Sequence, residues 1–153
     1  MATNTLIQKL FASDESGVGE DTVTASNRRE TETFFASESI SDGDLVCLDI
    51  SKTSDGDKMS YVKKLDVTAG LTAVAIGVAD QDASANERIV VVIKGFKADA
   101  NIATGAAVGE RFIGTGTAGR GDVLANTSTI PALGYIVTEA AANQADVYIL
   151  KQF

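Results

Sequence analysis

Apolar and polar positions alternate in short runs from Thr33 onward, and turn residues separate the runs. The longest apolar run, IVVVI at 89–93, is β-branched throughout, which favours a strand over a helix of this length. Asp-Gly pairs supply the positive φ of tight turns, so the SDGD segments at 41–44 and 54–57 predict two hairpin turns. The pattern predicts eight strands, at 33–36, 45–50, 59–65, 73–79, 88–96, 110–113, 132–138 and 146–151.

One stretch of twenty residues, 77–96, is similar to a second stretch, 134–153, without a gap. Seven positions are identical: Gly77/Gly134, Ala83/Ala140, Ala85/Ala142, Asn86/Asn143, Val90/Val147, Lys94/Lys151 and Phe96/Phe153. The match predicts an internal duplication, although chance similarity in an Ala-rich and Val-rich chain is the alternative. Two related hairpin units that close into one small barrel or sandwich are the simplest interpretation. It places Phe96 and Phe153 at the ends of related strands.

The first thirty residues differ from the rest, because they contain little that could form a core. The exception is an amphipathic piece near the start, in which Leu6, Ile7, Leu10 and Phe11 recur at near-helical spacing. Residues 1–30 are therefore predicted to be an extended arm with this patch as its anchor. Residues 31–153 are predicted to form a mainly β core domain: a small antiparallel β-barrel, β-tulip-like or β-sandwich fold.

Composition excludes several kinds of function. The chain has no histidine and a single cysteine, Cys47, so histidine-based nucleophile systems, the usual zinc ligands and an intrachain disulfide are excluded. Cys47 lies in an apolar run and is interpreted as a buried small hydrophobic residue. A net charge of −8 argues against nucleic acid as a partner. No apolar run approaches the ~20 residues of a membrane span, and the start does not resemble a signal peptide, so we expect a cytosolic protein without membrane contact.

Three motifs suggest chemistry only weakly. GTGTAGRG at 114–121 contains the spacing of a dinucleotide-binding loop, but no helical pattern follows it, so a loop is the better interpretation. Asp80, Asp82, Asn86 and Glu87 offer oxygen ligands, but their spacing is not that of a calcium loop, and a polar turn is favoured. The SDGD acids are interpreted as turn residues in the same way. We expect no enzyme activity, metal or cofactor, because the chain has no histidine and few aromatic side chains from which an active-site pocket could be built.

From residue 40 onward, the order of strands and glycines resembles that of the head decoration, or cement, proteins of tailed bacteriophages. The segments that carry the resemblance are GDLV at 43–46, AVAIGVA at 73–79, VVVIKG at 90–95, ATGAAVGERFIGTG at 103–116, ALGYIVTE at 132–139 and the closing VYIL at 147–150. The resemblance covers about 110 residues and contains no catalytic signature.

The resemblance implies a small β-barrel domain on the outer surface of an icosahedral capsid, assembled in the host cytoplasm. It implies a homotrimer that clamps neighbouring major capsid proteins, with an N-terminal arm that docks on the shell. Leu6, Ile7, Leu10 and Phe11 are then the capsid-docking residues. Two alternatives stay open. One is a virion-displayed module that binds carbohydrate or a host surface through rings such as Tyr61, Tyr135 and Tyr148. The other is a tail-tube or head-completion protein.

Overall fold

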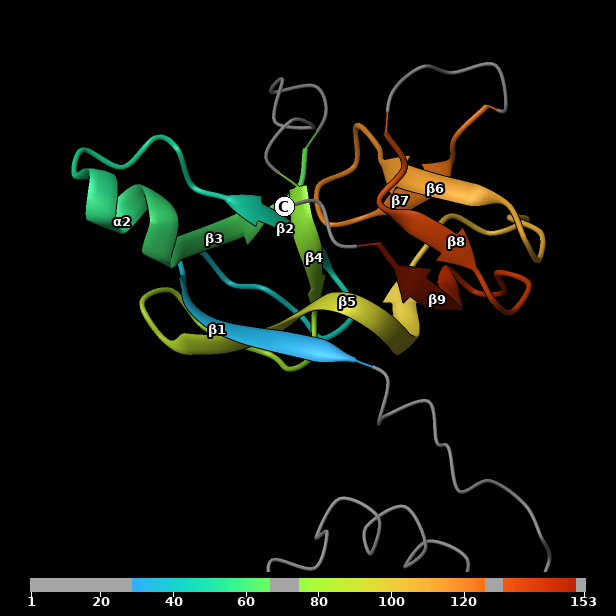
Figure 1. Cartoon of the computed structure of the whole chain (residues 1–153), viewed down its shortest axis with the longest axis horizontal. Coiled ribbons are helices and arrows are strands. Elements are labelled where there is room, and N and C mark those ends of the chain that lie inside the picture. The colour runs from blue at the N-terminus through green and yellow to red at the C-terminus, as the bar shows by residue number, and fades with distance from the viewer. Residues whose placement is uncertain (1–28, 67–74, 126–130, 151–153) are drawn as a thin grey trace, which may run out of the picture.

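The computed structural model describes residues 29–66, 75–125 and 131–150. The predicted docking residues Leu6, Ile7, Leu10 and Phe11 lie outside these ranges. In the described part, no helix is long and apolar enough to cross a membrane. Figure 1 shows the arrangement of its elements. They are β1 (Glu30–Ala36), β2 (Leu45–Leu48), α2 (Asp55–Ser60), β3 (Tyr61–Lys64), β4 (Ala75–Ala79), β5 (Arg88–Asn101), β6 (Arg111–Gly114), β7 (Gly121–Val123), β8 (Gly134–Ile136) and β9 (Gln144–Ile149).

The first five strands form a closed β-barrel. The strand order is β1-β3-β2-β4-β5, and β1 closes the ring because it pairs in parallel with β3 and antiparallel with β5. The prediction of a mainly β, barrel-type domain is therefore confirmed. The interior is filled mainly by branched aliphatic side chains, among them Val46, Ile76, Ile89 and Val91. β1 meets β3 only at its end, through Phe35 and Ala36, while Glu30–Phe35 pair with β5.

A second sheet continues from the same strand. β5 has 14 residues, and its second half pairs with β9, after which the sheet runs β9-β8-β6-β7. A parallel bridge between Ile102 and Gly121 brings β7 back to the end of β5. Phe112, Ile136 and Val147 are buried inside this second half. The long β5 thus joins two similarly built halves, as Figure 1 shows (yellow).

The two similar sequence stretches hold corresponding places in these halves. Residues 77–96 contain the end of β4 and the first part of β5, and residues 134–150 contain β8 and β9. The first strand of each pair is hydrogen-bonded to an earlier strand, β4 to β2 and β8 to β6. Gly77 faces Val46, and Gly134 faces Phe112, in the same register. Within the hairpins the registers differ by one residue. A common origin of the two stretches stays a prediction, and Phe153 lies outside the described residues.

Hydrogen bonds outside the similar stretches repeat as well. The backbone N–H of Ser41 donates to the Asp44 carboxylate, and that of Ala107 donates to the Glu110 carboxylate. Gly43 and Gly109, each next to one of these acids, both have φ of +85°. The turn that leads into β2 is thus built like the turn that leads into β6, although the two segments share little sequence beyond the glycine.

The structure corrects the interpretation of the second SDGD segment. Residues 54–57 form no hairpin turn: Ser54 caps the helix α2, and its hydroxyl accepts the N–H of Asp57. Acidic residues in the first helical turn and Lys58 in the last favour this helix through its dipole. The predicted strand at 59–65 therefore begins only at Tyr61. The sequence does not predict β7, because its first residue, Gly121, belongs to the glycine-rich segment interpreted as a loop.

Asp49, at the end of β2, fixes the loop that leads to α2. Its carboxylate accepts hydrogen bonds from the Ser37 and Ser51 hydroxyls, at 2.6 and 2.5 Å, and lies 3.3 Å from the Lys63 ammonium. Burial by itself would raise the pKa of Asp49, but these donors outweigh it and lower the pKa to about 2. The folded chain therefore favours the ionised carboxylate.

Replacing Asp49 with asparagine is expected to lower the free energy of unfolding at pH 7 by about 2 kcal/mol. This is the free energy that corresponds to the lowering of the Asp49 pKa from 3.8 to about 2 on folding. A lowered folded-state pKa stabilises the fold above the unfolded pKa of about 4, and this stability is lost as the pH falls toward 2. The variant should therefore lose less stability than the parent between pH 5 and pH 2. Urea titrations at several pH values measure both effects. Asp57→Asn on exposed α2 is the control, and an equal acid response in Asp49→Asn and the parent would contradict the assignment.

Candidate functional site

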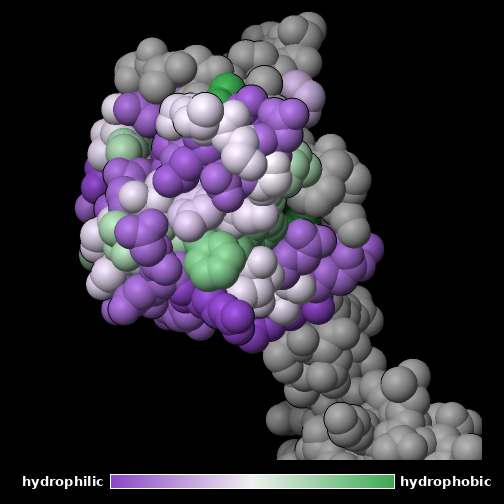
Figure 2. Space-filling view, turned by 90° about the vertical axis from the view of Figure 1, so that its left-hand side faces the viewer, coloured by the Kyte–Doolittle hydropathy of each residue, from purple (hydrophilic) through white to green (hydrophobic). Residues whose placement is uncertain are grey.

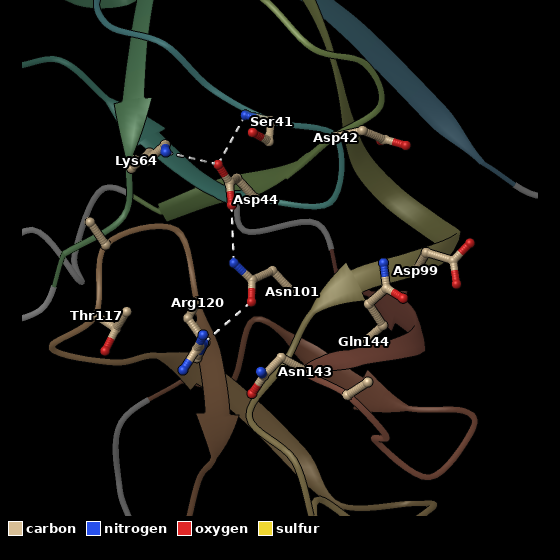
Figure 3. Close-up of a pocket in the computed structure, with 12 residues that line it drawn as sticks. Ser41, Asp42, Asp44, Lys64, Asp99, Asn101, Thr117, Arg120, Asn143 and Gln144 are labelled. Carbon is tan, nitrogen blue, oxygen red and sulfur yellow. Dashed lines mark hydrogen bonds and ion pairs between the residues drawn. The ribbon is translucent and has the colours of Figure 1, made fainter.

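A polar groove of about 550 Å³ lies where the two halves meet (Figure 3). Its walls come from the turn before β2, the end of β3, the end of β5, the β6–β7 turn and the β8–β9 turn. The lining residues are Ser41, Asp42, Asp44, Lys64, Asp99, Asn101, Thr117, Ala118, Arg120, Ala142, Asn143 and Gln144. Three of them, Asp99, Ala142 and Asn143, have positive φ without being glycine.

Asp44 lies at the centre of the groove and is 5% exposed. One of its carboxylate oxygens accepts the Asn101 amide at 3.1 Å, and the other accepts the Ser41 N–H at 3.0 Å and lies 3.3 Å from the Lys64 ammonium. The Arg120 guanidinium donates to the Asn101 side-chain oxygen at 3.3 Å. The dashed lines in Figure 3 trace this network from Lys64 to Arg120. It links the first half to the second.

Gly119 brings the β6–β7 turn against Asp44. A Cβ at this position would lie 2.8 Å from the Asp44 carboxylate, and the φ of Gly119 is +76°. The carbonyl of Gly119 also accepts the N–H of Leu45, which begins β2. The glycines of the GTGTAGRG segment therefore serve a tight turn that docks on the first half. A strand follows them, and not the helix N-terminus that a dinucleotide needs.

Lys97 is a buried cation beside the groove. It is 5% exposed, lies 2.9 Å from Asp42 and 3.7 Å from Asp80, and donates to the carbonyl of Ala98. Arg29 forms a second ion pair with Asp80, at 3.1 Å. The acids of the loop after β4 and of the turn before β2 are thus partly neutralised by cations of the chain itself.

The other acids of the loop between β4 and β5 act as backbone acceptors. Asp82 accepts the N–H of Asp42 at 2.8 Å, and Glu87 accepts the N–H of Ser84 at 2.7 Å. Across residues 29–66, 75–125 and 131–150, no three His, Cys, Asp or Glu side chains gather into a group that could hold a metal ion. These contacts are those of a polar turn.

The groove network is expected to contribute to stability. Asp44→Asn replaces an acceptor with an amide that faces three donors, so we expect the free energy of unfolding to fall by about 1–3 kcal/mol. Urea denaturation followed by circular dichroism measures the change. Asp99→Asn is the matched control, because Asp99 lines the same groove but is exposed, and asparagine tolerates its φ of +53°. Equal stability of Asp44→Asn and Asp99→Asn would contradict a linking role for the network.

Aromatic side chains gather on the outer face of the second sheet. Phe96, Tyr148 and Tyr135 are direct neighbours on β5, β9 and β8, and Arg111 follows on β6. Tyr148 is 37% and Tyr135 41% exposed, and Phe96 is half-buried. These three rings are a third of the chain's six Phe and three Tyr. We call Phe96, Tyr148 and Tyr135 the aromatic row.

The opposite end of the molecule, around α2, is different. Figure 2 views this side and shows a mostly hydrophilic surface with small, separate apolar patches. Tyr61 does not stand free there: its ring lies 5.4 Å from that of Phe35, and the Lys52 ammonium lies 4.2 Å from its centre. Of the three tyrosines considered from the sequence, only Tyr135 and Tyr148 therefore share a surface.

Cys47 is fully buried in β2. Burial raises the pKa of its thiol to about 11, so the thiolate is scarce at neutral pH. The interpretation of Cys47 as a buried small hydrophobic residue agrees with this position.

No family model matches the sequence, and no curated protein matches it. Among solved structures, the chain is similar to the N base of head fiber gp8.5 in bacteriophage phi29, with a TM-score of 0.54 and 16% sequence identity. The similarity covers 80% of this chain and 94% of that one. At this identity the similarity establishes a shared fold. The function of this chain has to be inferred from its own surface residues.

Proposed function

We propose that the chain is a structural protein of a phage head, which decorates the outer capsid surface and stabilises it by bridging neighbouring major capsid proteins. The observation that carries the proposal is the fold shared with a phage head fiber base over nearly the whole of that chain. The strand and glycine order noted in the sequence supports the same class of protein. The proposed role is adhesion without catalysis.

The described domain is suited to adhesion because it is built to be rigid. The first half is a closed barrel, and the Asp44–Asn101–Arg120 network fastens the second half to it. A rigid domain loses little conformational entropy when it binds, which improves affinity. Contacts with a shell would use side-chain surfaces and the N-terminal arm.

We assign the shell contact to the arm residues Leu6, Ile7, Leu10 and Phe11, as the sequence predicts. Two ion pairs hold the base of the arm on the domain: Arg29 with Asp80 at 3.1 Å and Glu30 with Lys94 at 3.2 Å. Many copies on one shell, each bound weakly, would give a large total stabilisation through avidity. A homotrimer at three-fold positions would let each copy reach more than one capsid protein.

The proposal is tested with purified protein and isolated, expanded heads that lack it. We expect saturable binding in sedimentation, and decorated heads that release their DNA at a higher temperature than bare heads. The reconstructed density of decorated heads should place each copy across a boundary between capsid proteins. Absence of binding would contradict the shell role, and binding without a change in release temperature would contradict bridging.

A further inference from the structure

The aromatic row is an exposed apolar surface that the described residues leave uncovered. Adjacent strands lie about 4.8 Å apart, so Phe96, Tyr148 and Tyr135, with Arg111 beyond them, extend about 14 Å across four strands. Val137, which follows β8, is also exposed. A face of this kind, with rings rimmed by charged residues, is typical of a docking surface.

The chain enters the described domain beside this face. Glu30 is the Cα partner of Lys94 in the β1–β5 ladder, and the next residue of β5, Gly95, is already paired with Ile149 of β9. Lys94 precedes Phe96 by two residues, or about 7 Å along the strand. Figure 1 shows that β1 begins below β5 and β9. Residues 1–28 therefore join the described domain at the edge of the aromatic row.

The apolar segment of those residues is within reach of the row. Residues 12–29, about 18 in number, separate Phe11 from Glu30. A chain of that length has a root-mean-square span of about 25 Å, which exceeds the distance from Lys94 to any ring of the row. A tether of this length gives an effective concentration on the order of millimolar for contact within one copy.

We propose that Leu6–Phe11 docks on the aromatic row of its own copy when the protein is free. The spacing of Leu6, Ile7, Leu10 and Phe11 puts them on one side of a helix, which matches a flat apolar sheet face. Docking covers the two apolar surfaces with each other and keeps free copies from associating through them. The proposal concerns the free protein and does not depend on a capsid. On a shell, the same four side chains would exchange the row for a capsid surface.

Paramagnetic labelling tests the proposal on the full chain. Ala12→Cys carries a nitroxide label next to the apolar segment, and in the proposed helix its position is opposite the four apolar residues. Cys47 does not compete for the label, because it is fully buried with a pKa of about 11. We expect the amide signals of Phe96, Tyr135 and Tyr148 to lose more than half of their intensity, and those of Phe35 and Tyr61 in the first barrel to lose little.

Two further samples decide between occupants of the row. Leu10→Asp together with Phe11→Asp should restore the signals, while Lys9→Ala should not. A mixture of labelled chains without nitrogen-15 and unlabelled chains with nitrogen-15 should show no loss. Loss of the same size in the mixture would assign the row to the arm of a second copy and overturn the proposal. Undiminished signals in the labelled chain would also overturn it, as would row signals that respond to a panel of sugars and not to the label.

Discussion

Replacing Gly134 with alanine is expected to lower the free energy of unfolding by about 3 kcal/mol or more. A Cβ there would lie 2.2 Å from the carbonyl oxygen of Tyr148 and 2.7 Å from the ring of Phe112. The first of these contacts is backbone, so it can be relieved only if β8 and β9 separate. Gly77→Ala should have an equally large effect, because its Cβ would lie 2.1 Å from the carbonyl oxygen of Val92.

Urea denaturation followed by circular dichroism measures these losses. Gly56→Ala is the control, because Gly56 lies in α2 and its added Cβ would lie 3.6 Å from the Ser54 hydroxyl, an ordinary van der Waals contact. Alanine favours helix over glycine, so this variant should be as stable as the parent or more stable by up to about 1 kcal/mol. If Gly134→Ala unfolded at the same urea concentration as Gly56→Ala, the close approach of β8 to β9 would be wrong.

If the proposed docking role is right, deleting residues 2–28 is expected to reduce binding to heads by at least about 100-fold, because it removes the four apolar side chains proposed as anchors, worth about 1.5 kcal/mol or more each. The domain should remain folded, with a melting temperature within about 2 °C of the parent, since the deletion spares every described strand. Stopping at residue 28 matters, because Arg29 and Glu30 form ion pairs with Asp80 and Lys94. The arm predicted from the sequence ends at residue 30, which is the first residue of β1.

A substitution variant distinguishes the effect of losing the four proposed apolar anchors from the effect of shortening the arm. Changing Leu6, Ile7, Leu10 and Phe11 together to alanine should reduce binding nearly as much as the deletion, whereas Lys9→Ala should leave it close to that of the parent. Sedimentation with heads measures all of these proteins, and calorimetry measures their melting temperatures. Full occupancy of heads by the truncated protein would contradict the docking role of the arm.

Much of the fold follows from local sequence signals. The β-branched run at 89–93 lies in β5, and Asp-Gly at 42–43 forms a turn with Gly43 at a φ of +85°. The same dipeptide at 55–56 lies in a helix instead, because Ser54 caps it and the following residues favour the helix dipole. A dipeptide signal therefore decides a turn only where the neighbouring residues do not offer a helix cap.

The repeat of the two halves is less visible in the sequence than in the backbone. The turns at 41–44 and 107–110 have the same hydrogen bonds, yet SDGD and AVGE share only the glycine. These hydrogen bonds need a carboxylate, which either Asp44 or Glu110 supplies, and the positive φ favours glycine at the position before it. The two stretches are therefore most similar where an added side chain would clash with the backbone, as at Gly77 and Gly134.

The groove could not be predicted from the sequence. Asp44 and Asn101 are 57 residues apart, and their contact depends on how the two halves pair. Nothing local to Asn101 or Arg120 marks either as a partner of a buried carboxylate. The aromatic row could be predicted only in part. The sequence marks Tyr135 and Tyr148 as candidate binding rings, but only the β8–β9 register shows that they are neighbours.

The proposed shell role predicts that purified particles of a phage carrying this gene contain the protein as a structural component, and counting its copies there tests the proposal most directly. Quantitative mass spectrometry, with the major capsid protein as internal standard, gives the ratio of the two chains. We expect tens to hundreds of copies per particle in a fixed ratio to the capsid protein, which remains constant through repeated purification. Particles that contain no copies, or a number that falls with each purification step, would contradict the proposal that this chain is a structural part of the head.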